Sequence, residues 1–174
     1  LSSYWTGEAY YRTARWDKAL DAFNKFQVTP GAISQPVFNT ANYNIGYCYF
    51  KKKDYAKAAT GFRKYLAEKK TETKLAADAS LRLGDCYFMT KEYALAIEYY
   101  QKAATSKVND ADYAMYQAGI CYGVQGDMPN KIATLRKMLQ SYSKSSYTDD
   151  ALYEIGLTYN VTGKDSEALN YFQR

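Results

Sequence analysis

The sequence has no histidine, the side chain that most often serves as a general base or a metal ligand near neutral pH. Only 3 of its 174 residues are proline and 10 are glycine, a composition that favours long helices over loops and sheets. No apolar run approaches the roughly 20 residues that span a bilayer. These absences count against a histidine-dependent enzyme, a histidine-ligated metal centre and a membrane-spanning chain.

A strong charge of one sign is also missing. The net charge of +5 comes from 23 Lys+Arg and 18 Asp+Glu residues spread along the chain. The densest basic run is 51–53, and Asp54 follows it at once, as expected of a solvated helix end. Nucleic-acid binders usually gather their cations in a stripe and have a higher pI. We therefore expect no nucleic-acid partner.

The chain does contain an internal repeat, which is the first feature to seek in a sequence of this kind. The motif Gly-x-x-Tyr occurs as Gly7/Tyr10, Gly46/Tyr49, Gly84/Tyr87, Gly119/Tyr122 and Gly156/Tyr159. The glycines lie 39, 38, 35 and 37 residues apart. Sixteen residues after them stand the large apolar side chains Phe23, Phe62, Tyr100, Leu135 and Phe172. Five residues before the last four glycines stand Ala41, Ala79, Ala114 and Ala151. So many matches in one register indicate five copies of one structural unit.

Each unit is predicted to be a pair of helices. Apolar residues recur at three and four residues, which is one face of a helix. Turn signals such as Asp54 and Gly163 divide each unit in two. First helices are expected over 1–13, 36–52, 74–90, 110–125 and 147–161. Second helices are expected over 16–27, 55–69, 92–106, 128–142 and 165–174. Glycine and alanine let the paired helices approach closely, and large side chains fill the space opposite.

The pattern resembles the tetratricopeptide repeat, in which Leu-Gly, Tyr, Ala, Phe and Ala recur over 34 residues. It departs from that repeat in two ways, because the closing proline is missing at most joints and the spacing exceeds 34 by one to five residues. The resemblance implies an all-α fold, a right-handed superhelical stack of antiparallel helix pairs (an α-solenoid) with about ten helices. It implies a single array whose repeats cover roughly 1–34, 35–72, 73–108, 109–145 and 146–174.

The three cysteines each lie two residues after a repeat glycine, at Cys48, Cys86 and Cys121, where the other units have Ala9 and Thr158. That position needs a small side chain between packed helices. Equivalent positions in successive repeats are about 10 Å or more apart, whereas a disulfide needs α-carbons within about 7 Å. We expect buried structural cysteines, no metal site and no cofactor.

No constellation for catalysis stands out. No glycine-rich loop that could cradle a phosphate appears in the sequence. Carboxylates such as Asp149 and Asp150 stand where helices begin, and there they favour the positive end of the helix dipole. We expect a non-catalytic protein.

Tyrosine is the residue in excess, with 20 copies. By the resemblance, the first helices line a concave groove that holds a partner. The candidate partner-binding residues in that groove are Tyr4, Tyr43, Tyr47, Lys51, Asp78, Arg82, Asp85, Tyr113, Tyr116, Ile120 and Tyr153. Tyrosine suits a binding surface because it offers large area, little entropy to lose and a polar tip. The alternative is that many of these rings pack between repeats, as we expect for Phe50 and Phe88.

Some members of the resembled family grip a C-terminal carboxylate with a set of Lys, Asn and Arg residues. The corresponding positions here hold Tyr4, Glu8, Asn44, Asp78 and Arg82, of which only Asn44 and Arg82 match. We therefore do not expect an adaptor that binds chaperone tails.

The fourth joint has a narrower resemblance. It contains Tyr142-Ser-Lys-Ser and, a few residues later, Asp150-Ala-Leu-Tyr-Glu-Ile-Gly. This looks like the Tyr-Pro-x-Ser joint and Asp-Ala-x-Tyr-x-Leu-Gly helix of bacterial envelope proteins, namely the Tol–Pal-associated periplasmic protein and the outer-membrane assembly lipoproteins. Ser143 replaces the proline. The resemblance implies a scaffold in the bacterial periplasm or at the outer membrane, with a cytoplasmic location as the alternative.

Three functions stay open. The leading hypothesis is a scaffold that binds a protein or peptide segment in the groove, without a small-molecule substrate. The second is a spacer or oligomerisation module, because the last unit ends at 171–174 without a polar cap and could self-associate there. The third is a helical appendage of a larger protein whose activity lies outside this segment. The start at Leu1 and the helical pattern that runs to Arg174 lead us to expect a piece of a longer chain.

Overall fold

The computed structural model describes residues 1–68, 73–106 and 110–174. In this part of the chain it contains ten α-helices, one short 3₁₀ turn and no strand. The all-α prediction is therefore confirmed for the described residues. The expected repeat boundaries at 72/73 and 108/109 lie outside them.

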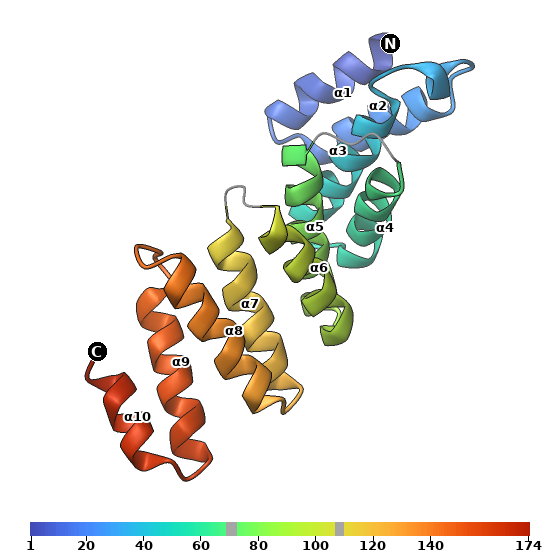
Figure 1. Ribbon diagram of the computed structural model, residues 1–174. Coiled ribbons are helices and arrows are strands. Elements are labelled where there is room, and N and C mark those ends of the chain that lie inside the picture. Colours follow the sequence, from blue (N-terminus) through green and yellow to red (C-terminus); the bar gives the residue numbers. More distant parts are fainter. Residues whose placement is uncertain (69–72, 107–109) are drawn as a thin grey trace. The chain divides into compact units, whose positions relative to one another are not determined.

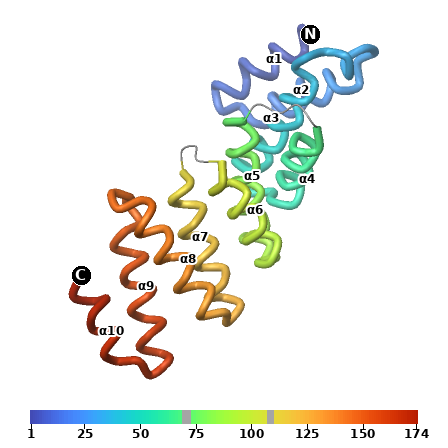
Figure 2. The backbone as a smooth tube through the Cα atoms, in the orientation of Figure 1, coloured from blue at the N-terminus to red at the C-terminus, as the bar shows by residue number. Residues whose placement is uncertain are grey.

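The chain divides into two compact units, Leu1–Lys91 and Glu92–Arg174. The helices of the first unit are α1 (Ser2–Arg12), α2 (Trp16–Gln27), α3 (Phe38–Lys51), α4 (Tyr55–Leu66) and α5 (Thr73–Met89), with the 3₁₀ turn η1 (Ala32–Ser34) between α2 and α3 (Figure 1). Those of the second unit are α6 (Tyr93–Thr105), α7 (Ala111–Val124), α8 (Met128–Ser141), α9 (Thr148–Val161) and α10 (Asp165–Phe172). Within each unit, consecutive helices pack against each other and alternate in direction (Figure 2).

Nearly all helix bounds agree with the sequence prediction to within two residues. The exception is α4, which was expected to continue to 69 and instead ends at Leu66. Its last turn tightens, since Glu68 N–H donates to the carbonyl of Tyr65 rather than to the residue one further back. Position 69 itself lies outside the described residues.

The turn η1 was not expected from the sequence. Gly31, with φ 76°, starts it in the left-handed region, which glycine adopts without steric cost. Ala32 is then buried against α2 and α3. The additional residues of the first joint thus contribute to the core of the unit.

Each helix pair turns at one repeated position, seven residues after the repeat glycine. The backbone there is left-handed in all five repeats, at Ala14 (φ 55°), Lys53 (φ 61°), Lys91 (φ 64°), Gly126 (φ 80°) and Gly163 (φ 72°). At two of these turns an aspartate caps the second helix, because Asp54 accepts from Lys57 N–H and Asp127 from Asn130 N–H. The sharp reversal sets the two helices of a pair side by side.

The repeat glycines pack against the large side chain of the second helix. A Cβ atom at Gly7 would lie 2.6 Å from the ring of Phe23, and one at Gly156 would lie 2.5 Å from that of Phe172. The same holds for Gly119 beside Leu135. The repeat alanines Ala41, Ala79, Ala114 and Ala151 are fully buried. Small residues opposite large ones therefore build the core, as the pattern predicts.

Candidate functional site

The first helices of the first unit form the face on which most of the candidate binding residues lie. Helix α3 contacts both α1 and α5. The repeat register brings side chains from these three helices to one side, because equivalent positions in successive repeats point the same way. We call this surface the first-helix face.

Glu8 is the centre of a polar cluster between α1 and α3. The hydroxyl of Tyr4 donates to Glu8 Oε1 at 3.0 Å, and the side-chain amide of Asn44 donates to the same oxygen. Arg12 Nε lies 3.7 Å from Glu8 Oε2. The Asn44 amide, one of the two matches to the carboxylate-gripping set, is thus already occupied by a carboxylate of the protein itself.

A second cluster joins α3 to α5. The hydroxyl of Tyr43 donates to Asp78 Oδ2 at 2.7 Å. Arg82 lies between two acids, since its Nη1 donates to Asp85 Oδ2 at 2.7 Å and its Nε lies 3.5 Å from Asp78 Oδ1. That Nε is buried and makes no hydrogen bond within the described residues. The candidate charges Asp78, Arg82 and Asp85 therefore largely satisfy one another.

The pKa values on this face follow from these contacts. Burial, together with the negative charge of Asp78, raises the pKa of Tyr43 far above its ordinary value. Burial and the nearby Glu8 likewise raise the pKa of Tyr4. For Arg82, burial acts to lower the pKa, but the charges of Asp85 and Asp78 outweigh it and raise the pKa overall. At neutral pH the tyrosines stay protonated hydrogen-bond donors and Arg82 stays a cation.

Half-buried rings line the open part of the face. The ring centroid of Tyr11 lies 5.8 Å from that of Tyr47, and Tyr47 lies 6.2 Å from Phe50. Lys51 is exposed, and its Nζ lies 5.2 Å from the centre of the Tyr47 ring. Arg12, next to Tyr11 on α1, is also exposed. We call these five residues the aromatic–basic strip.

The structure separates the candidate tyrosines by their exposure. Tyr4 and Tyr43 are only 4% and 9% exposed, so their rings pack between helices and little of them could touch a partner. Tyr47 is half-buried, with one part of its ring open. Phe50, expected to pack, does so against Tyr47 and Tyr55 while staying half-buried.

The second unit carries the remaining candidates on α7 and α9. Tyr113 and Tyr116 both contact the ring of Tyr147, at centroid distances of 5.5 and 5.3 Å. Burial, with the charge of Asp150, raises the pKa of Tyr116. Tyr153 on α9 is 57% exposed. Ile120 on α7 is half-buried.

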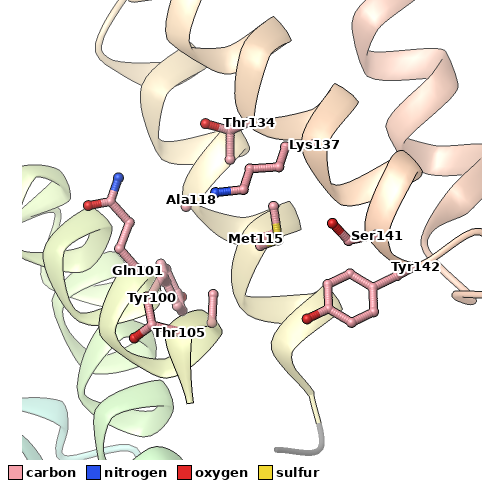
Figure 3. Close-up of a pocket in the computed structure, with 10 residues that line it drawn as sticks. Tyr100, Gln101, Thr105, Met115, Ala118, Thr134, Lys137, Ser141 and Tyr142 are labelled. Carbon is pink, nitrogen blue, oxygen red and sulfur yellow. The ribbon is translucent and has the colours of Figure 1, made fainter. Parts of the chain in front are cut away.

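A cavity of about 510 Å³ lies in the second unit among α6, α7 and α8 (Figure 3). Its lining includes the buried ring of Tyr100, with Met115 and Ala118 on α7. Lys137 of α8 extends its amine into this space, and Tyr142 closes one side (Figure 3). The sequence analysis missed this cavity because it sought a binding surface only on the first helices, whereas Tyr100, Lys137 and Tyr142 of the lining lie outside them.

The prediction that the cysteines are buried is confirmed, since Cys48, Cys86 and Cys121 are all fully buried, and each is a free thiol. Burial raises the pKa of the Cys48 and Cys86 thiols to about 12. Among the described residues, no group of three or more Cys, Asp or Glu side chains could hold a metal ion. No helix in the described ranges is long and apolar enough to cross a bilayer.

Comparison with known sequences identifies the repeat. One profile described as "Tetratricopeptide repeat" matches residues 66–112, and a second with the same description matches 2–28, 40–68 and 113–145. The chain belongs to the tetratricopeptide repeat family. Proteins of this family act as protein-interaction scaffolds, with repeats stacked so that each contacts its neighbours. No curated protein matches the sequence.

Solved tetratricopeptide structures share the fold. A crystal structure of MamA is 24% identical, with a TM-score of 0.77, covering 96% of this chain and 90% of that one. A second MamA structure is 23% identical, with a TM-score of 0.79 and coverage of 98% and 86%. YrrB, described as "a TPR protein with an unusual peptide-binding site", is 23% identical, with a TM-score of 0.75 and coverage of 96% and 79%. At this level of identity the likeness concerns the fold.

Proposed function

We propose that this tetratricopeptide protein is a non-catalytic scaffold whose first-helix face binds a segment of a partner protein. The aromatic–basic strip, Tyr11, Arg12, Tyr47, Phe50 and Lys51, is the observation that carries the proposal. Half-buried rings offer apolar area that is already held in place, so a partner loses little of the binding energy to ordering them. The peptide-binding site named for the similarly folded YrrB supports a peptide as the ligand.

The charges of the face favour an acidic partner segment. The carboxylates Glu8, Asp78 and Asp85 are already paired with donors of the protein. Lys51 has no ion pair within the described ranges, and its Nζ lies over the Tyr47 ring. Arg12 contacts Glu8 from a largely exposed position, with 77% of its side chain open to solvent. The charge left for a partner is therefore positive, and the partner segment should combine acidic with apolar or aromatic residues.

The titration of the buried groups supports the absence of catalysis. A thiol with a pKa of about 12 is almost entirely protonated at neutral pH and is a poor nucleophile. The buried tyrosines are shifted in the same direction, away from acid–base work near pH 7. Neither group is poised for chemistry.

Selection from a phage-displayed library of random peptides tests the binding proposal. Wild-type protein should enrich peptides with Asp or Glu beside apolar residues. Lys51→Glu should lower the affinity for the selected peptides about tenfold, because losing one well-placed contact between opposite charges costs about 1.4 kcal/mol. Lys64→Glu, the same charge change on the exposed side of α4, is the matched control and should leave the affinity unchanged. Equal affinities for the two variants would reject the strip as the binding surface.

The fourth joint leads to a proposal about location. Its resemblance to envelope proteins supports a role in bacterial envelope assembly, in the periplasm or at the outer membrane. Reading the full gene and fractionating the cells test this. A protein found only in the cytoplasm, encoded without an export signal, would reject it and leave the cytoplasmic alternative.

A second candidate function is that of a spacer or oligomerisation module. The observation that favours it is the set of large apolar side chains left exposed on α9 and α10. Light scattering over a range of protein concentrations tests it. A mass of 19.8 kDa at every concentration would reject self-association.

A further inference from the structure

The cavity among α6, α7 and α8 is lined by two alanines that stand where the other repeats have larger side chains. Ala104 lies on α6, twenty residues after its repeat glycine, and Ala118 lies on α7, directly before the next repeat glycine. At the other three joints the same two positions hold Gln27 and Ile45, Leu66 and Leu83, and Leu139 and Ile155. The short side chains at this joint therefore leave open a space that longer ones would occupy.

The larger residues do occupy this space at two of the other joints. At the first joint, the side-chain amide of Gln27 donates to Asn42 Oδ1 at 2.7 Å and bridges α2 to α3. At the last joint, Leu139 packs against the core cluster that contains Ile155. A hollow of about 470 Å³ lies outside Leu139, between α8 and α10, and none of the described residues that line it belongs to α9. Leu139 thus closes the floor that Ala104 leaves open.

The open joint combines an apolar floor with a polar rim. The floor is formed by Tyr100, Ala104, Met115 and Ala118. The rim on the side of α8 is formed by Thr134, Lys137, Ser141 and Tyr142. Pockets that bind small ligands typically enclose roughly 300–1,000 Å³ and have a mostly apolar lining with a few polar groups. The cavity, at about 510 Å³, has the size and the composition of such a pocket.

Lys137 gives the rim a positive charge. It makes no ion pair with another residue that the structure describes, and it extends its amine into the cavity (Figure 3). Lys131 on the same helix, by contrast, donates to Glu154 Oε2 at 2.6 Å. The hydroxyl groups of Ser141 and Tyr142 also lie at the rim and can donate hydrogen bonds (Figure 3). Donors of this kind suit an anion, because hydrogen bonds between charged groups are the strong ones.

We propose that this cavity binds a carboxylate with a compact apolar body. The body packs on Tyr100, Met115 and the two alanines, and the carboxylate meets the amine of Lys137. One lysine balances one negative charge, which favours a carboxylate over a phosphate group with its charge of about −2 near pH 7. A free aromatic acid and the last residue of a peptide with an apolar end share this chemistry. The site lies in the second unit and does not depend on peptide binding by the first-helix face.

NMR titration of protein with carbon-13 in its methionine methyl groups tests the site. Adding 3-phenylpropionate should shift the Met115 methyl resonance saturably, with a dissociation constant on the order of 1 mM for so small a ligand. The methyl group of Met89, in the first unit, should not shift. The uncharged 3-phenylpropionamide should bind about fivefold more weakly. N-acetyl-glycyl-phenylalanine distinguishes the sources, since tighter binding than the free acid identifies a peptide end and weaker binding identifies a free acid.

Two variants test the floor and the rim separately. Ala104→Leu should abolish binding, because leucine fills the space, and it should fold with an unchanged circular dichroism spectrum, because leucine occupies this position at Leu66 and Leu139. Lys137→Gln should weaken binding of the acid about fivefold and leave binding of the amide unchanged. Lys64→Gln is the matched control, because Lys64 and Lys137 both lie eighteen residues after a repeat glycine, and it should bind like wild type.

The outcomes that would overturn the proposal are distinct. A Met115 methyl resonance that does not shift, or folded Ala104→Leu protein that binds like wild type, would reject the cavity as a site. Equal affinities for the acid and the amide, or equal affinities of Lys137→Gln and Lys64→Gln for the acid, would reject a carboxylate as the ligand. None of these results bears on the first-helix face.

Discussion

Replacing Gly61 with alanine should destabilise the first unit, although alanine is the better helix former. A Cβ atom at Gly61 would lie 2.6 Å from both Cα and N of Gly46, and 2.9 Å from the carbonyl oxygen of Asn42. These neighbours are all backbone atoms of α3, so no side chain can rotate to make room. Ordinary contact needs at least 3.4 Å, and α4 must therefore move away from α3.

The expected size follows from two opposing contributions. Alanine gains about 1 kcal/mol over glycine inside a helix. Overpacking typically costs about 1–3 kcal/mol, and rigid backbone neighbours place this site at or beyond the upper end. The displacement also loosens the packing of Phe62 and Tyr65, which are buried on α4. We expect a net loss of about 2 kcal/mol, or a fall in Tm of roughly 4–8 °C.

Urea unfolding followed by circular dichroism measures this change. Gly156→Ala is the matched control, because the three atoms nearest to its new methyl group all belong to the ring of Phe172. That ring is 48% exposed and free to turn, so the control should stay within about 0.5 kcal/mol of wild type. If Gly61→Ala were as stable as wild type, the close α3–α4 packing would be refuted.

Two further predictions concern the turns and the response to pH. Lys53→Gly should stabilise the fold by about 0.5–1 kcal/mol, because residue 53 has a left-handed backbone with φ 61°. Gly126→Ala, at the same repeat position with φ 80°, should cost a similar amount in thermal unfolding. With no histidine, stability should be flat between about pH 6 and 8. It should fall above about pH 9, because the Cys48 and Cys86 thiols have a pKa raised to about 12 and stay protonated in the folded state while the unfolded chain loses their protons. Above about pH 10 the raised pKa of Tyr43 adds to the loss of stability, for the same reason. Urea unfolding at several pH values up to 11 measures the free energy of unfolding. A value that stayed constant over this range would contradict the prediction.

The helices were predictable from the sequence because the same spacing of small and large residues occurs in all five repeats. The pairing of Gly7 with Phe23 recurs as Gly156 with Phe172, so one packing rule covers both ends of the chain. The turn η1 occurs only once among the described residues and depends on the left-handed backbone of Gly31, so comparing the repeats could not predict it. The left-handed backbone at the turn of each helix pair was also not predicted from the sequence, because only some of these turns have glycine at that position.

The candidate site was predictable in position but not in its bonding. The register correctly brought Tyr47, Lys51 and Asp78 to one group of helices. The register did not reveal that Glu8 accepts a hydrogen bond from the side-chain amide of Asn44, because that bond depends on the distance between two helices of different repeats. The cavity beside Lys137 follows from room left between second helices, which a helix pattern does not encode.

Amide and side-chain NMR of the protein with a selected acidic peptide tests the central claim most directly. We predict that the largest shifts fall on Tyr11, Tyr47 and Lys51, together with the Nε–H resonance of Arg82, which has no hydrogen-bond partner in the described part of the chain. Shifts confined to the cavity around Lys137, or none in the first unit, would contradict the assignment of partner binding to the first-helix face.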